Sequence, residues 1–201
     1  MLAGAIEIRR SLWRGGYQSF RGEHFTVEAA RVFDLPDPPV PIAVAGGTQA
    51  AGLAAEFGDQ RISDRPDPEV VDAYRNAGGA GSIWTQIAVC WGEDASRALQ
   101  LAPDHFRFSA LGWKVMSELP NPVNFDAATQ TVTSQHLAGT IPAGPDADRY
   151  VDAVRTASDA GFERVAFVQI GHDQEGRFRF WTEELAPRLG APTHEPVAAG
   201  A

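Results

Sequence analysis

The sequence PIAVAGGTQAAGLAAEFGD, at residues 41–59, is the most informative stretch of the chain. It begins as a short apolar strand, turns at Gly46 and Gly47, and continues directly into a helix of small residues. Two consecutive glycines let the backbone come close to a ligand, and the first N–H groups of a helix attract an anion such as phosphate. The stretch therefore predicts a phosphate-binding loop that uses no lysine or arginine.

Two better-known phosphate motifs do not fit this stretch. Gly47 and Gly52 have the spacing of a P-loop, but Leu53-Ala54 stands where that motif requires Lys followed by Ser or Thr. The dinucleotide fingerprint G-x-G-x-x-G is also absent from it. Hydrolysis of a nucleoside triphosphate is therefore disfavoured. A purely structural alternative stays open, in which Thr48 caps the helix and the glycines only form a tight turn.

Length and composition indicate one ordinary globular domain. The chain has 201 residues, of which 44% are hydrophobic and 21% are charged, enough to bury one sizeable core. We expect a domain at residues 1–189 and a disordered tail at residues 190–201. The net charge of -9 disfavours nucleic-acid partners. The sequence contains no apolar run of about 18 residues, so no membrane span is predicted. The N-terminus also lacks a signal-peptide pattern, and we therefore expect a cytoplasmic protein without a membrane partner.

Strands and helices alternate along most of the chain. Before residue 42 we expect a helix that ends at Gly15-Gly16 and two short strands around a turn at residues 21–24. The expected strands then lie at residues 42–45, 61–64, 83–91 and 164–170, and the expected helices lie at residues 49–57, 69–76, 148–160 and 175–189, with one more from about residue 94. Residues 103–132 show an interrupted helical pattern that is typical of an insertion.

This alternation predicts an α/β fold with a parallel sheet. Four strand-helix units correspond to half of an eight-unit barrel, which takes about 250 residues when complete. We therefore expect a TIM-barrel-like fold of which only the C-terminal four strand-helix units are present, with an irregular helical insertion before the last strand. Four strands alone would leave an open barrel edge, which favours a homo-oligomer or association with a partner through that edge.

Few other residues suggest chemistry. His172 directly follows the last strand, where a barrel enzyme keeps functional groups, and is a candidate proton shuttle. In the alternative, Asp173 caps the last helix and His172 is a surface residue.

Cys90 is the single cysteine and is expected to be a buried, inert thiol. The other histidines lack metal-ligand spacing, so no metal is predicted. The aromatic residues of the last helix, including Phe178 and Phe180, are expected to pack against the sheet, with a cofactor ring as the alternative.

Four segments in combination resemble a known family. They are RGEHFTVEAARVFDLPDPPVPIAVAGG at residues 21–47, GD at 58–59, QIAVCWGED at 86–94 and DAGFERVAFVQIGHDQEGRFRFWTEELAPRL at 159–189. Together they resemble the C-terminal part of the luciferase-like flavin and deazaflavin oxidoreductases. Within that superfamily they are most similar to the branch that contains coenzyme F420-dependent glucose-6-phosphate dehydrogenase and its relatives.

The resemblance implies a TIM-like barrel that holds its cofactor at the C-terminal ends of the strands. The expected cofactor is coenzyme F420, a deazaflavin that transfers hydride to or from a small-molecule substrate, and FMN with monooxygenation is the alternative. Gln86 and Gln169 are cofactor-lining candidates by position, or polar groups that are satisfied inside the barrel. The residues implied to hold the cofactor phosphate through backbone N–H groups are Ala45, Gly46, Gly47 and Thr48.

The chain departs from the family in two respects. The family places its His, Trp and Glu acid/base residues in an N-terminal half that has no counterpart here, so a non-catalytic half-barrel that associates with a partner is the competing hypothesis. Residues 64–67 and the region of Gly139 stand where the sugar-phosphate enzyme keeps substrate-binding hydroxyl and cationic groups. Because Asp64 and Asp67 would repel a phosphate and only Arg65 offsets them, glucose 6-phosphate is a poor candidate substrate.

Overall fold

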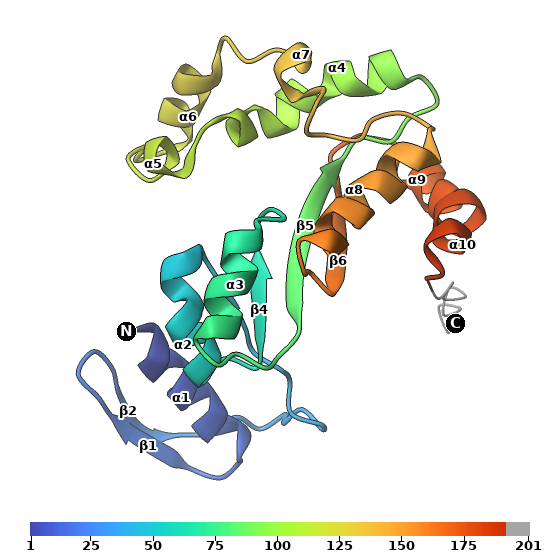
Figure 1. The fold of residues 1–201 in the computed structure, drawn as a ribbon. Helices are drawn as coiled ribbons and strands as arrows, with labels where there is room; N and C mark the ends of the chain where they lie inside the picture. Colours follow the sequence, from blue (N-terminus) through green and yellow to red (C-terminus); the bar gives the residue numbers. More distant parts are fainter. Residues whose placement is uncertain (192–201) are drawn as a thin grey trace. The chain divides into compact units, whose positions relative to one another are not determined.

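The structure, a computed structural model, describes residues 1–191 and is shown in Figure 1. Residues 192–201 of the tail expected to be disordered lie outside the described residues. The contacts divide the chain into two compact units, one of Met1–Gln86 with Ala157–Val165 and the other of Ile87–Thr156 with the residues from Ala166 onward. Within residues 1–191, no helix has the length and apolar character that crossing a membrane requires.

The predicted parallel sheet is confirmed. Its strands lie side by side in the order β3-β4-β5-β6, and both β3 with β4 and β4 with β5 pair in parallel. Their bounds are β3 (Ala43–Ala45), β4 (Gln60–Ser63), β5 (Ile83–Val89) and β6 (Arg164–Gln169). A helix follows each strand, so the chain is an α/β protein with part of a TIM-like barrel, as expected. These helices are α2 (Ala51–Phe57), α3 (Pro68–Asn76), α4 (Ala95–Phe106) and α9 (Gln174–Phe180).

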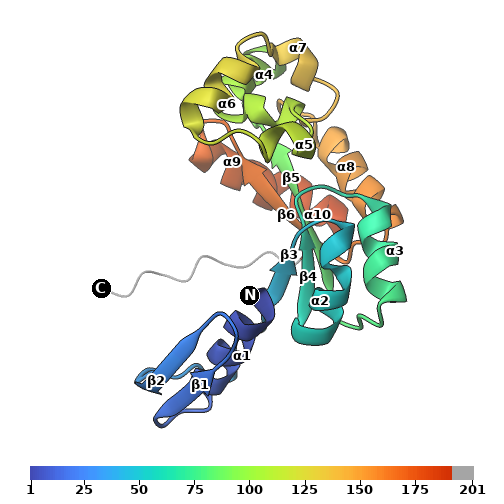
Figure 2. The same ribbon diagram turned by 90° about the vertical axis from the view of Figure 1, so that its left-hand side faces the viewer.

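In the first unit, one face of the sheet is buried and the other is open. Val44, Arg61 and Ile83 stand in register on neighbouring strands and are all buried. Helix α2 contacts both β3 and β4, and α3 packs beside α2 (Figure 2). Side chains alternate between the two faces of a strand, and the next residues along β3, Ala43 and Ala45, are exposed. The exposed face is the one that lines the interior of a closed barrel.

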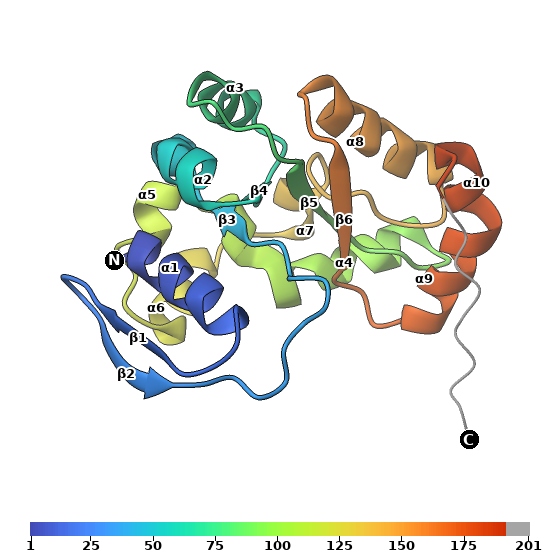
Figure 3. The same cartoon turned by 90° about the horizontal axis from the view of Figure 1, so that it is seen from below.

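The N-terminal elements also match the prediction. Helix α1 (Leu2–Trp13) ends before Gly15 and Gly16, which both have positive φ angles. The strands β1 (Gln18–Arg21) and β2 (Thr26–Ala30) then pair in an antiparallel hairpin. Figure 3 shows this hairpin beside α1.

The Gly58-Asp59 pair has a structural role in the first unit. The Asp59 carboxylate accepts a hydrogen bond of 2.8 Å from the backbone N–H of Ile42, at the start of β3, and one of 2.8 Å from Arg10 in α1. A Cβ atom at Gly58 would lie 2.8 Å from the carbonyl oxygen of Ala54, so only glycine fits there. These contacts fix β3 and α1 against the end of α2.

Replacing Asp59 by alanine is expected to lower the free energy of unfolding by about 1 kcal/mol. The variant loses the bond to the backbone of Ile42, whereas the half-exposed ion pair with Arg10 contributes little. Asp72→Ala, at an exposed position of α3, is the matched control and should change stability by less than about 0.5 kcal/mol. Urea denaturation compares the two variants, and equal losses would contradict the role given to Asp59.

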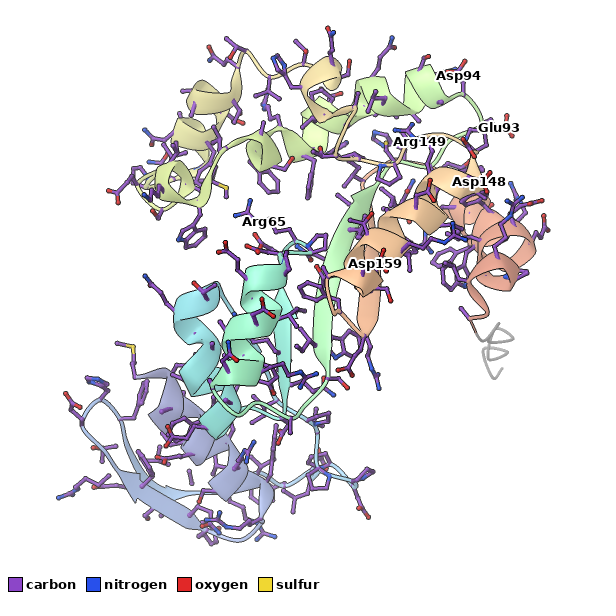
Figure 4. The ribbon with its side chains drawn as sticks, viewed as in Figure 1. Arg65, Glu93, Asp94, Asp148, Arg149 and Asp159 are labelled. Atoms are coloured by element: carbon purple, nitrogen blue, oxygen red, sulfur yellow. The ribbon has the colours of Figure 1, made fainter. Side chains whose placement is uncertain are left out.

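The second unit contains the irregular insertion. Between β5 and β6 the chain forms α4 and then a series of short elements, which confirms the interrupted pattern expected at residues 103–132. These elements are η2 (Arg107–Ala110), α5 (Trp113–Met116), α6 (Pro122–Thr129) and α7 (Ser134–Leu137), and α8 (Ala147–Asp159) follows them. Asp94 caps α4 by accepting a bond of 2.8 Å from the N–H of Arg97 (Figure 4).

Cys90 is buried, as expected. It belongs to an apolar cluster of the second unit, and its thiol donates to the carbonyl oxygen of Ala98 at 3.0 Å. Burial raises the pKa of the Cys90 thiol, which disfavours the reactive thiolate.

The last helical segment packs differently from the prediction. It runs from α9 through a π-helical turn, η3 (Trp181–Leu185), into α10 (Ala186–Leu189). Phe180 is buried, but 61% of Phe178 is exposed. Two residues apart, their side chains point to nearly opposite sides of a helix, so both could not face the sheet. The expected packing of Phe178 was therefore wrong.

Candidate functional site

The candidate phosphate site is the glycine loop, residues 45–48, at the C-terminal end of β3. All four of its residues are exposed. Gly46 has a φ angle of 147°, and a Cβ atom there would lie 3.0 Å from the Cβ of Ala50. Gly47 has an extended backbone, with φ -82° and ψ -168°, and a Cβ atom there would meet nothing within 4 Å. The fold therefore requires glycine at Gly46 but not at Gly47.

Thr48 does not cap a helix through its side chain. It is the first residue of η1 (Thr48–Ala50), whose N-cap is Gly47, and no side-chain cap bond is formed there. Helix α2 starts only at Ala51. The structural alternative for Thr48 as a capping residue is therefore wrong, and the first N–H groups of this turn are not used by its hydroxyl.

Arg61, a residue that the sequence did not indicate, binds the carbonyl groups of the glycine loop. Arg61, on β4, is 0% exposed. Its guanidinium donates to the carbonyl oxygens of Val44 at 2.7 Å and of Gly47 at 2.8 Å, and also to that of Gly46. Burial lowers the pKa of Arg61 from its ordinary value, but arginine remains protonated in proteins. Three carbonyl groups of the loop region are thus fixed by one buried cation.

This arrangement turns two N–H groups outward. In a planar trans peptide the C=O and the next N–H point in opposite directions. Because the carbonyls of Gly46 and Gly47 point toward Arg61, the N–H groups of Gly47 and Thr48 point away from it. Across residues 1–191, neither of these N–H groups donates to an acceptor. An exposed loop with two outward, unused N–H groups and open space beside Gly47 fits a phosphate group.

The two glutamine candidates differ in their surroundings. In the second unit, the Gln169 amide accepts from the backbone N–H of Trp91 at 3.0 Å and donates to the Trp91 carbonyl at 3.3 Å. Gln86 is half-buried on β5, and its side chain makes no hydrogen bond to any described residue. Gln169 therefore has a clear structural use, and the cofactor-lining role of both residues stays a prediction.

Replacing Gln169 by leucine is expected to destabilise the protein by about 2 kcal/mol. Leucine fills a similar volume but leaves both backbone groups of Trp91, a buried residue, without their partner. Gln86→Leu is the matched control, because its amide has no protein partner to lose, and should stay within about 0.5 kcal/mol. Thermal unfolding of the two variants checks the difference; a stable Gln169→Leu protein would show that solvent replaces the lost bonds.

His172 pairs with a second histidine of the same unit. The Nε2 atoms of His105 and His172 lie 3.3 Å apart, and the rings meet edge to face with centroids 5.1 Å apart. Asp173 caps α9 by accepting from the N–H of Gly176 at 2.8 Å, as the alternative interpretation expected. Both histidines are exposed, and the catalytic role of His172 stays a prediction.

The segment after β4 is occupied by structural bonds. Asp67 caps α3 by accepting from the N–H of Glu69 at 3.0 Å, and the Ser63 hydroxyl donates to the carbonyl of Arg65 at 2.8 Å. The Arg65 side chain is exposed in the loop that follows β4 (Figure 4). Within the part of the chain that the structure describes, no group of three or more His, Cys, Asp or Glu side chains could hold a metal ion.

Comparison with known proteins identifies relatives of this chain. The model of the family described as luciferase-like monooxygenase matches residues 1–162. A curated relative, the F420-dependent glucose-6-phosphate dehydrogenase of Nocardia farcinica, is 29% identical over 205 residues. That alignment covers 94% of this chain but 60% of the relative. The chain thus spans about three fifths of the length of the curated relatives it matches.

Two solved structures share the fold. An F420-dependent secondary alcohol dehydrogenase in complex with an F420-acetone adduct has a TM-score of 0.73 at 18% identity, covering 90% of this chain and 59% of that one. The coenzyme F420-dependent tetrahydromethanopterin reductase from Methanopyrus kandleri has a TM-score of 0.68 at 16% identity, covering 92% of this chain and 63% of that one. At these identities the likeness concerns the fold alone.

Proposed function

Because this chain belongs to the luciferase-like monooxygenase family, we propose that its glycine loop binds the phosphate of coenzyme F420. We propose further that the chain functions in deazaflavin-dependent oxidoreduction. One observation carries the proposal. The N–H groups of Gly47 and Thr48 are unused and point outward from an exposed loop that begins where β3 ends. Barrel enzymes keep their ligands at this end of the strands.

The loop residues bind and orient the cofactor. The N–H groups of Gly47 and Thr48 donate to phosphate oxygens, and bonds of this charge-assisted kind are about twice as strong as neutral ones. Gly46 provides the positive φ angle that the turn before these groups requires. When bound, the deazaflavin would supply a carbon centre that accepts or donates a hydride, which is a hydrogen together with two electrons. His172 remains the candidate for moving a proton in the second unit.

The choice of F420 over FMN rests on the relatives rather than on the loop. Both cofactors carry a phosphate, and a loop that binds phosphate through backbone groups does not read the ring. The names of the curated relatives support F420. FMN with monooxygenation is the alternative, in keeping with the family description.

A direct titration tests the proposal. The purified chain is titrated with F420 and, separately, with FMN, and binding is followed by quenching of the cofactor fluorescence. We expect saturable binding of F420, and FMN binding at least about 10-fold weaker. Tighter binding of FMN would transfer the assignment to a flavin enzyme. A well-folded chain that binds neither cofactor would contradict the proposal.

A second candidate function is a half-barrel that binds a partner. The open face of the sheet in the first unit favours it, because Ala43 and Ala45 are exposed and Ile62 and Trp84 are only half-buried. The indole N–H of Trp84 is buried without a hydrogen-bond partner among the described residues. In a closed barrel, facing strands cover such residues. Sedimentation of the purified chain tests this candidate: a homo-oligomer supports association, and a monomer that binds cofactor contradicts the need for it.

The substrate and the location stay open to experiment. We propose a small-molecule substrate other than glucose 6-phosphate, because the segment after β4 carries Asp64 and Asp67 with Arg65. The cytoplasmic location expected from the sequence stays a prediction.

A further inference from the structure

Arg61 is an unusual residue for its position. It is fully buried in a strand, where arginine is seldom found unless its charge is paired. Its hydrogen-bond partners among residues 1–191 are carbonyl oxygens only, those of Val44, Gly46, Gly47 and Ile62. Its Nε atom is buried and has no partner there. A buried cation without a carboxylate is costly, which calls for a counter-charge.

No side chain supplies that counter-charge in the described structure. No ion pair within residues 1–191 involves Arg61, and its neighbour Tyr74, on α3, carries no carboxylate. Burial lowers the pKa of Arg61, as expected for a cation without an anionic neighbour. The missing charge must then come from a bound group or be tolerated.

The geometry of the glycine loop indicates where a bound anion would sit. The loop carbonyls point toward the guanidinium, and the N–H groups on the other side of the same peptides are free and exposed. Each peptide dipole therefore has its negative end at the cation and its positive end at the open side. An anion on the open side would therefore be stabilised by the positive ends of these dipoles and by the charge of Arg61 behind them.

We propose that Arg61 is the positioning residue and the charge source of the anion site, so that a phosphate on the glycine loop is the counter-ion of this buried arginine. The inference rests on the proposed function but goes beyond it. It assigns selectivity for anions to a residue that does not touch the ligand. The sequence motif of the loop, which contains no basic residue, thus acquires its positive charge from the neighbouring strand.

The first test separates the phosphate from the rest of the cofactor. The protein is titrated with F420 and with the corresponding deazaflavin riboside, which lacks the phosphate. Arg61→Gln is expected to weaken F420 binding about 20-fold and riboside binding less than about 2-fold. Arg61→Lys keeps the charge and should restore F420 affinity to within about 5-fold of the unaltered chain. Equal weakening of both ligands, or no weakening of either, would overturn the proposal.

A matched control removes the same charge elsewhere. Arg65 is exposed in the loop after β4, and Arg65→Gln should change the affinity for F420 less than about 2-fold. If it weakens F420 as much as Arg61→Gln does, the effect is one of overall charge and the special role of Arg61 is overturned.

A second measurement uses the unaltered chain, in case Arg61→Gln does not fold. Inorganic phosphate should raise the Tm of the chain more than chloride does at equal ionic strength, since it supplies the missing counter-charge. Gly47→Val, which blocks the open side of the loop, should abolish this difference. A phosphate effect that persists in Gly47→Val overturns the proposal, and so does its absence from the unaltered chain. Because this arm uses no cofactor, it also separates the inference from the proposed function: failure to bind F420 alone overturns only the latter.

Discussion

Replacing Gly47 by valine is expected to weaken F420 binding by about 100-fold, or about 2.7 kcal/mol, without loss of stability. The backbone at Gly47 is extended, which suits a β-branched residue, and a Cβ atom there meets nothing in the protein. The valine methyl groups would instead occupy the space through which a phosphate reaches the N–H groups of Gly47 and Thr48. The variant therefore separates ligand binding from folding.

Fluorescence titration measures the affinity, and thermal unfolding measures the stability. Gly52→Ala is the matched control, because Gly52 is exposed on α2 and its substitution also meets open space. It should leave F420 affinity unchanged and raise stability by up to about 1 kcal/mol, since alanine favours helix more than glycine does. A Gly47→Val protein that binds F420 normally would remove the glycine loop from the cofactor site.

Replacing Gly81 by alanine is expected to destabilise the protein by about 3 kcal/mol or more. A Cβ atom at Gly81 would lie 1.9 Å from the carbonyl oxygen of Asp59, which is backbone and cannot move aside cheaply. The N–H of Gly81 also donates to the hydroxyl of Tyr74 at 3.2 Å, a side chain that is 1% exposed. Relief of the clash must therefore shift the start of β5 or the end of α2.

Urea denaturation or the yield of folded protein measures this loss. Gly112→Ala provides the control in a loop, since Gly112 has a negative φ angle and open space around it, and it should change stability by less than about 0.5 kcal/mol. A Gly81→Ala protein as stable as the unaltered chain would contradict the close packing between the segment before β5 and Asp59.

The order of strands and helices could be predicted from the sequence because each element has a strong local signal. Apolar runs of strand length alternate with amphipathic helices, and glycines and prolines separate them. The predicted strands at residues 42–45 and 61–64 correspond to β3 and β4 within one residue at each end. The Phe178 prediction was wrong because it assigned all the aromatic residues of the last helix to one face. Residues two positions apart, such as Phe178 and Phe180, point to nearly opposite sides of a helix.

The glycine loop could be located from sequence, but its support could not. Gly46 and Gly47 indicate that the backbone can come close to a ligand. Arg61 lies on the next strand and acts through a contact between strands, which the sequence does not show. An arginine in a short strand pattern is normally assigned to the surface. One signal was available: Arg61 stands between Gln60 and Ile62 in a strand of a parallel sheet, a class of sheet that is usually covered on both faces.

The roles of Gln169 and Asp59 also depend on tertiary contacts. Each side chain bonds to the backbone of a residue distant in sequence, Trp91 and Ile42. Such pairs leave no periodic trace in the sequence. They explain two of the motifs that carry the family resemblance, the GD pair and the glutamine of QIGHD, as structural elements that hold strands in place.

Phosphate binding by the glycine loop can be observed directly at the amide groups of the loop while the cofactor binds. In a ¹⁵N-labelled chain, the ¹H–¹⁵N signals of Gly47 and Thr48 should shift downfield on addition of F420, because their N–H groups donate to the phosphate. They should move little on addition of the phosphate-free riboside. If F420 saturates the protein while both signals stay in place, the phosphate is held elsewhere and the account of this site is wrong.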